Sequence, residues 1–337
     1  MKRRIVTVLL ALALLPSASP ARTISTEPRP DPREAPAAPS YVQRVEPALV
    51  GLHVRADPDR PSSARLGAQR YGTAIVFDPR GYAVTVSYVV LDAVRIEARL
   101  RDGRLAGARV AGLDLDTGLA VVRLEGEGPW PVADLVSSAD VRVGAVTGTV
   151  GIDEDDDLVQ VTSTVKGIRR FSAFWEYMLD RALLLAPSIS SWGGSAAVDD
   201  RGRVIGIVSL RVGDDPYVSV AIPAEKLLAV KDELITAGRV ISRRPRPWLG
   251  LYTAAEEGRV VVDGFNDAGP ARQAGFRRGD AIVGVNGVAV RSQEEFYEAL
   301  WARQAGDTIA VAVQRGARVQ TISVRSIDRH QLYQRTP

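Results

Sequence analysis

The stretch SSWGGSAAVDDRGRVIGIVSL, residues 190–210, decides the fold class. It contains two short runs of small and β-branched apolar residues, Ala196–Val198 and Val204–Leu210, which are separated by polar residues and Gly202. Short apolar runs bounded by glycine, aspartate or proline are typical of the strands of all-β sandwiches and barrels. We therefore expect both runs to be strands of a mainly β domain.

The same pattern of short apolar runs extends from Tyr41 to about Val220, on both sides of the quoted stretch. The strands expected in its first half are 49–54, 72–77, 83–87, 95–100, 105–113 and 119–124. Those expected in its second half are 145–151, 158–168, 182–186, 196–198, 204–210 and 218–222. Because two barrels of similar size would account for this series, we expect a double β-barrel over residues 41–240.

A helical pattern follows the last strand. Apolar residues recur at near-helical intervals from Pro223 to Thr236, and Gly238 closes the segment. Residues 241–247 are rich in arginine and proline, and we interpret them as a hinge.

A second, compact α+β domain is expected over residues 248–326, followed by a polar tail at 327–337. Its one strong helix is predicted to begin at Ser292, whose hydroxyl forms a capping box with Glu295, and to end near Gln304.

Composition excludes several functional classes. The chain has 337 residues with a formal charge of +3, and no block of five or six cations suggests nucleic acid as the main partner. It has no cysteine and only two histidines, His53 and His330, which lie far apart in the sequence. We therefore expect no disulfide, no metal site and no cofactor.

The N-terminus carries a targeting pattern. Lys2, Arg3 and Arg4 precede the apolar run Ile5–Leu15, and small residues then allow cleavage after Ala21. This arrangement predicts a signal peptide at residues 1–21 and export to a periplasmic or extracytoplasmic space, with an uncleaved anchor as the alternative. Residues 22–40 are dense in proline and alanine and are expected to form a flexible tether.

Four stretches, in the same order along the chain, resemble the HtrA family of extracytoplasmic serine proteases. The resemblance implies a chymotrypsin/trypsin-like double β-barrel followed by one C-terminal PDZ domain, and it covers most of residues 41–326. The matching stretches are Gly81–Val90, Asp114–Val121, Ser190–Ala196 with Gly202–Ile207, and Ala221–Pro223 with the PDZ-like segments Trp248–Leu251 and Ala271–Gly287.

The resemblance places the three catalytic positions of the family at Tyr88, Gly118 and Trp192, where the family has histidine, aspartate and serine. A serine attacks a carbonyl well only if an imidazole takes its proton, and that imidazole needs a carboxylate to orient it. A tyrosine, with a pKa of about 10, is a poor base at neutral pH. We therefore expect no intact catalytic site.

Residues outside the triad positions offer little to replace it. His53 lies in the first expected strand and is interpreted as a half-buried structural residue, and His330 as a solvated residue of the tail. Ser188, Ser190, Ser191 and Ser195 surround the lost nucleophile, and Lys166 is the one lysine between Tyr41 and Val220. A Ser/Lys dyad stays open as an alternative.

The PDZ-like segment keeps the residues that its function needs. In the family, the turn that Trp248-Leu249-Gly250-Leu251 resembles binds a terminal carboxylate through its backbone N–H groups. The peptide then adds a strand beside residues 251–253. The resemblance implies that Phe296 and Leu300 line this groove from the helix; the alternative is a groove filled internally by Trp248.

Two further features have competing interpretations. The acidic run Asp153–Asp157 lacks the spacing of a calcium loop and is expected to be a solvated turn. The aromatic residues of 171–177 fall where the resemblance places a sensor loop, so they belong either to the core or to an interface with the PDZ domain or a neighbouring subunit.

These observations predict an exported pseudoprotease that binds C-terminal peptides or unfolded exported proteins through its PDZ domain, as a trimer or another homo-oligomer. Two alternatives remain. The chain could be a serine endopeptidase with unconventional residual activity, or an inactive subunit that regulates active relatives in mixed oligomers.

Overall fold

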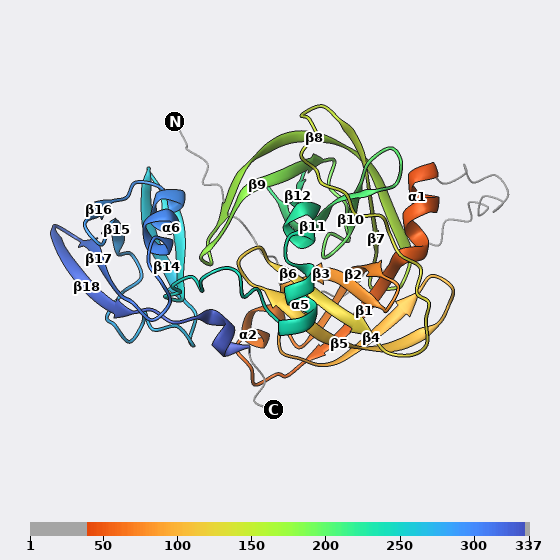
Figure 1. Cartoon of the computed structure of the whole chain (residues 1–337). Helices are drawn as coiled ribbons and strands as arrows, with labels where there is room; N and C mark the ends of the chain where they lie inside the picture. The colour runs from red at the N-terminus through yellow and green to blue at the C-terminus, as the bar shows by residue number, and fades with distance from the viewer. Residues whose placement is uncertain (1–38, 334–337) are drawn as a thin grey trace, which may run out of the picture.

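The computed structural model describes residues 39–333 (Figure 1). The expected signal peptide at 1–21, nearly all of the tether at 22–40 and the last four residues of the tail lie outside this range. Within it, no helix has the length and apolar character that crossing a membrane requires.

Two closed antiparallel β-barrels make up the first domain (Figure 1). The first has the strand order β1-β2-β3-β6-β5-β4 and the second the order β10-β11-β12-β9-β8-β7. Their bounds are β1 Leu49–Ala56, β2 Gln69–Asp78, β3 Tyr82–Val86, β4 Ala93–Leu100, β5 Leu105–Asp114, β6 Leu119–Leu124, β7 Val146–Ile152, β8 Leu158–Ala173, β9 Tyr177–Ala186, β10 Ala196–Val198, β11 Val204–Val212 and β12 Val218–Pro223. The predicted double barrel is confirmed.

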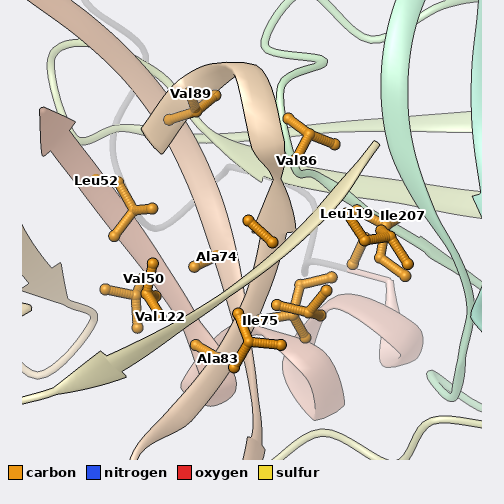
Figure 2. Packing of buried hydrophobic residues seen from close by; sticks show 14 of the residues in the cluster. Val50, Leu52, Ala74, Ile75, Ala83, Val86, Val89, Leu119, Val122 and Ile207 are labelled. Carbon is orange, nitrogen blue, oxygen red and sulfur yellow. The ribbon is translucent and has the colours of Figure 1, made fainter. Parts of the chain in front are cut away.

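The quoted stretch that decides the fold class forms β10 and β11, which pair antiparallel with Ala196 opposite Ile207. One apolar cluster runs through both barrels, because Ile207 of the second barrel belongs to the same cluster as Val86 and Leu119 of the first (Figure 2). The two barrels therefore share one continuous packed core.

Short helices connect and cover the strands. They are α1 Ser40–Val45, η1 Glu46–Ala48, α2 Ser63–Leu66, α3 Ser87–Val90, α4 Ala224–Leu228 and α5 Lys231–Ala237. The helical pattern from Pro223 to Thr236 forms the two helices α4 and α5, which Val230 separates at φ −133° and ψ 3°. Gly238 ends α5 in the left-handed conformation, as its position predicts.

The C-terminal domain is one sheet with a single long helix. Its strands follow the order β13-β14-β15-β17-β18, with β16 paired to β15, so β13 lies at an edge. Their bounds are β13 Leu251–Glu256, β14 Arg259–Phe265, β15 Ala281–Val285, β16 Val288–Ala289, β17 Thr308–Arg315 and β18 Arg318–Arg325, with α6 at Gln293–Trp301 and η2 at Arg329–Leu332. The predicted α+β domain is confirmed.

Helix α6 begins as expected, because the Ser292 hydroxyl accepts the N–H of Glu295 at 3.1 Å. The other half of the capping box differs. The Glu295 carboxylate accepts the N–H of Arg291, one residue before the cap. The helix ends at Trp301, three residues before the predicted end.

Candidate functional site

Tyr88 lies in the one-turn helix α3 and joins the two barrels. Its hydroxyl donates a hydrogen bond of 2.7 Å to the carbonyl of Ser209 in β11. Burial raises the pKa of Tyr88 well above its usual range, and a side-chain hydrogen bond with Trp192 offsets part of this shift. Tyr88 is therefore a structural hydrogen-bond donor that stays protonated at neutral pH.

Gly118 lies beside the start of α3, since its carbonyl accepts the N–H of Ser87 at 2.7 Å. Its φ of +81° is a conformation that glycine adopts without strain. A side chain added here would begin 3.3 Å from the ring of Tyr177. The Tyr177 hydroxyl donates to the Thr117 carbonyl at 2.8 Å, so a tyrosine from β9 takes the space that a carboxylate would need.

Trp192 lies in the loop between β9 and β10. Its half-buried ring packs against an apolar cluster of the second barrel that includes Val165, Leu185 and Ile189. The Tyr88 hydroxyl lies close to Gly193, the residue after Trp192, since a Cβ added there would be 3.1 Å from it. Tyr88 and Trp192 offer neither a serine nucleophile nor a base, and Gly118 has no side chain.

The neighbouring serines have partners that are not bases. The hydroxyl of Ser195 donates to the Ser191 carbonyl, and the hydroxyls of Ser188 and Ser219 lie 2.8 Å apart. Ser190 and Lys166 are exposed. Nothing in these contacts activates a serine.

Gly193 and Gly194, which follow Trp192, form a tight turn. The Gly193 carbonyl accepts the N–H of Thr73 at 2.8 Å, and the Gly194 N–H donates to the Val208 carbonyl at 2.9 Å. A side chain at Gly194 would meet the Thr73 carbonyl at 2.0 Å, and its φ of +89° also requires glycine. The inherited loop geometry therefore serves to hold the two barrels together.

The acidic run is not simply a solvated turn, which corrects our expectation. Asp156, the next-to-last residue of the run, accepts a hydrogen bond from His53 at 2.8 Å and pairs with Arg99 at 2.7 Å. Both partners belong to the first barrel, whereas Asp156 lies between β7 and β8 of the second. The run therefore supplies an ion pair across the two barrels, and it gives His53 its structural role.

A second group of charges joins the hinge to the barrels. Arg243 pairs at 2.5 Å with Asp114, whose side chain is buried, while Arg246 and Arg329 approach Asp116 at 3.5 and 3.8 Å. His330 is half-buried beside this cluster and its pKa is lowered by burial. The prediction of a solvated His330 is wrong, because η2 packs the tail against the hinge.

The carboxylate-binding turn of the C-terminal domain is formed and occupied. The N–H groups of Leu249 and Leu251 donate to the side-chain carboxylate of Glu176 at 3.0 and 2.7 Å. Gly250 between them has a φ of +78°, and a side chain there would meet the Cα of Gly269 at 2.6 Å. Only glycine allows the turn to direct both N–H groups at one carboxylate.

Glu176 itself is 1% exposed, at the turn between β8 and β9. Burial raises the pKa of this carboxyl to about 7, although the hydrogen bonds from Leu249 and Leu251 act in the opposite direction. Sequence reasoning missed Glu176, because nothing local distinguishes one glutamate in a hairpin turn. The neighbouring aromatic residues were the one signal, and they left core packing and an interface equally open.

The edge strand β13 also has a partner. The N–H of Thr253 donates to the Phe174 carbonyl at 2.9 Å, next to the Glu176 contact. Trp248 pairs through its backbone with Ile327, and its buried ring lies against Gly250, within 3.2 Å of a Cβ added there. Residues of the β8–β9 turn also occupy the groove.

Phe296 and Leu300 are fully buried in the core of the C-terminal domain. Among the side chains of α6 that reach the groove is Tyr297, whose hydroxyl donates to the Ala173 carbonyl at 2.6 Å. In the sequence, Tyr297 differs from the apolar residues on the same face of the helix by its hydroxyl group. In residues 39–333, no group of three histidine, cysteine, aspartate or glutamate side chains is placed to hold a metal ion.

Comparisons with known proteins divide the chain in the same way. Residues 72–207 match the trypsin-like peptidase domain family, and residues 247–325 match the PDZ domain family. The serine endoprotease DegS of Salmonella typhimurium is 26% identical over 341 residues, which cover 94% of this chain and 93% of DegS. The chloroplastic protease Do-like 1 of Arabidopsis thaliana is 28% identical over 285 residues, which cover 76% of this chain and 63% of the plant protein.

Among solved structures, the HtrA-type protease AlgW with a bound decapeptide has a similar fold. It superimposes with a TM-score of 0.54 at 23% sequence identity, covering 86% of this chain and 97% of that structure. This likeness concerns the fold alone.

Proposed function

Since this chain belongs to the HtrA family of trypsin-like serine proteases with a C-terminal PDZ domain, we propose that it is a member without peptidase activity that works by binding protein ends. Its ligands are C-terminal peptides or unfolded exported proteins. The names of its relatives refer to proteases, so the loss of activity is a property of this chain's own residues.

The observation that carries the proposal is the occupied carboxylate site. The N–H groups of Leu249 and Leu251 already hold a carboxylate, and the N–H of Thr253 already donates to a backbone carbonyl of the β8–β9 turn. Charge-assisted hydrogen bonds are about twice as strong as neutral ones, so a free C-terminus is the ligand chemistry that this turn favours.

The former catalytic cleft supports the loss of chemistry. Tyr88 bonds to a backbone carbonyl, Tyr177 occupies the space beside Gly118, and the ring of Trp192 packs on the second barrel. A triad without its nucleophile or its base loses about a million-fold in turnover.

Export and assembly belong to the same proposal. The apolar run Ile5–Leu15 after three cations supports export, by signal peptide or by uncleaved anchor. Assembly into a homo-oligomer, or into a mixed oligomer with active relatives, rests on the family resemblance. Light scattering on the purified chain, alone and with an active relative, would measure it.

The test of the proposed function is a screen of random peptides with free C-termini against the full chain and its Glu176→Ala variant. Selected peptides are then titrated with free and with amidated ends. We expect amidation to weaken binding at least tenfold. Equal affinity for both ends, in both proteins, would overturn capture of a carboxylate.

A further inference from the structure

The long hairpin of β8 and β9 reaches from the second barrel to the PDZ domain (Figure 1). Ala173 pairs with Tyr177, so the turn consists of Phe174, Trp175 and Glu176. In Figure 1 this green hairpin ends beside the C-terminal domain, and every contact of its turn described below is made with that domain.

The turn makes one backbone hydrogen bond to the edge of the PDZ sheet. The Phe174 carbonyl accepts the N–H of Thr253 at 2.9 Å, a contact of the kind that a peptide makes when it adds to a sheet edge. The ring of Phe174 lies 5.6 Å from that of Tyr252, the next residue along β13. The groove therefore receives both a backbone and a side chain from the hairpin.

Two residues farther along, Glu176 supplies the carboxylate. Its oxygens accept from Leu249 and Leu251, where the end of a peptide strand beside β13 would place its terminal carboxylate. The φ of Glu176 is +56°, which turns the chain away into β9 immediately after this contact. The side-chain carboxylate of Glu176 thus occupies the position of a peptide's terminal carboxylate, although the polypeptide continues into β9.

Helix α6 holds the other side of the hairpin. Tyr297 donates to the Ala173 carbonyl at 2.6 Å, the Ser172 hydroxyl donates to Glu294 at 2.7 Å, and Arg170 pairs with Glu298 at 2.6 Å. These contacts run along the whole helix face beside the groove. A bound peptide would need the same positions.

We propose that the β8–β9 turn is an internal ligand of the PDZ groove, in which the Glu176 carboxylate replaces a C-terminal carboxylate, so that an external C-terminal peptide binds only when the hairpin leaves. This inference rests on the proposed function, since it assumes that the groove takes such peptides. The apparent Kd for a peptide is then the intrinsic Kd divided by the fraction of molecules with an open groove.

The first experiment compares the full chain with two variants, Glu176→Ala and the control Glu154→Ala, which removes an exposed glutamate from another turn. The probe is a labelled heptapeptide with the sequence of residues 170–175 followed by valine, with a free or an amidated end. We expect Glu176→Ala to bind the free-ended probe at least tenfold more tightly than the unaltered chain, and Glu154→Ala to match the unaltered chain.

The outcomes separate the two proposals. Equal affinity of the unaltered chain and Glu176→Ala, with a preference for the free end in both, overturns the internal ligand and leaves the peptide-binding function standing. Loss of any preference for the free end in Glu176→Ala overturns carboxylate capture. Hydrogen exchange without peptide tests the hairpin alone, since Glu176→Ala should speed exchange at the Leu249, Leu251 and Thr253 amides, and unchanged exchange contradicts the internal ligand.

A surface variant tests the same proposal independently, in case Glu176→Ala does not fold. Arg170 and Glu298 are about half exposed, so Arg170→Glu leaves the cores intact and places two like charges together. It should raise probe affinity several-fold, and the charge-swapped pair Arg170→Glu with Glu298→Arg should return it to the original value. An unchanged affinity in Arg170→Glu would count against displacement of the hairpin.

Discussion

The hydroxyl of Tyr88, in the first barrel, donates a 2.7 Å hydrogen bond to the carbonyl of Ser209, in the second. Tyr88 is therefore part of the contact between the two barrels. This structural role leads to the first prediction.

Tyr88→Phe should destabilise the protein by about 1–3 kcal/mol, because the Ser209 carbonyl loses its donor in a buried site. Urea denaturation monitored by tryptophan fluorescence measures the change in the free energy of unfolding. Tyr217→Phe is the matched control, since Tyr217 is 38% exposed and its ring keeps the contact with Arg211. Similar losses in both variants would show that the hydroxyl of Tyr88 contributes nothing of its own.

We expect no peptidase activity, and we expect none after a serine nucleophile is introduced at position 192. We expect no hydrolysis of casein and no labelling by serine-directed phosphonates, in the unaltered chain or in Trp192→Ser, because triad residues act as a unit and no base faces this position. Activity of Trp192→Ser would reveal a base among the residues around the cleft. Activity of the unaltered chain that vanishes in Ser190→Ala, Ser191→Ala or Ser195→Ala would overturn the pseudoprotease proposal.

Introducing an aspartate at position 118 should destabilise the protein. Gly118→Asp combines a positive φ with a side chain that begins 3.3 Å from the Tyr177 ring, so we expect a loss of about 2 kcal/mol or more in unfolding free energy. Gly213→Asp isolates the backbone part, because Gly213 has a φ of +85° and no atom within 4 Å of an added Cβ.

The difference between the two variants measures the conflict with Tyr177. The same conflict should keep the triple variant Tyr88→His, Gly118→Asp and Trp192→Ser inactive in the casein assay. Equal destabilisation by Gly118→Asp and Gly213→Asp would show that Tyr177 moves aside without cost.

Docking of the β8–β9 turn should depend on pH. The Glu176 carboxyl has an ordinary pKa of 4.5 when free and a pKa of about 7 when buried, so the docked state holds the extra proton. Docking is therefore most favourable below about pH 4.5, and this advantage is lost as the pH rises to about 7. The charged and titratable groups around Glu176 are Arg329, Arg246, Asp116, Tyr252 and Tyr297, and Arg329 favours the ionised form.

Hydrogen exchange at the Leu251 amide, measured between pH 5 and 8 and corrected for the intrinsic rate, should show weaker protection at the higher pH. Glu176→Gln cannot ionise and should remove this dependence. A slope that is identical in Glu176→Gln would assign the titration to another group.

The elements that the sequence predicts well are those decided by neighbours along the chain. Gly238 ends α5 because a left-handed residue is needed there, and the Ser292 hydroxyl caps α6 because Glu295 follows three residues later. Strands β10 and β11 likewise follow from short apolar runs bounded by glycine and polar residues. The resemblance to a protease family adds the positions of Tyr88, Gly118 and Trp192, which are also read directly from the chain.

Only the tertiary structure determines which residues far apart in the sequence bind each other. Asp156 meets His53 across 103 residues, and Glu176 meets Leu251 across 75. In the sequence both acids resemble ordinary residues of exposed turns. Their roles arise because closing two barrels and packing a third sheet buries these carboxylates, and a buried carboxylate must find donors wherever the fold places them.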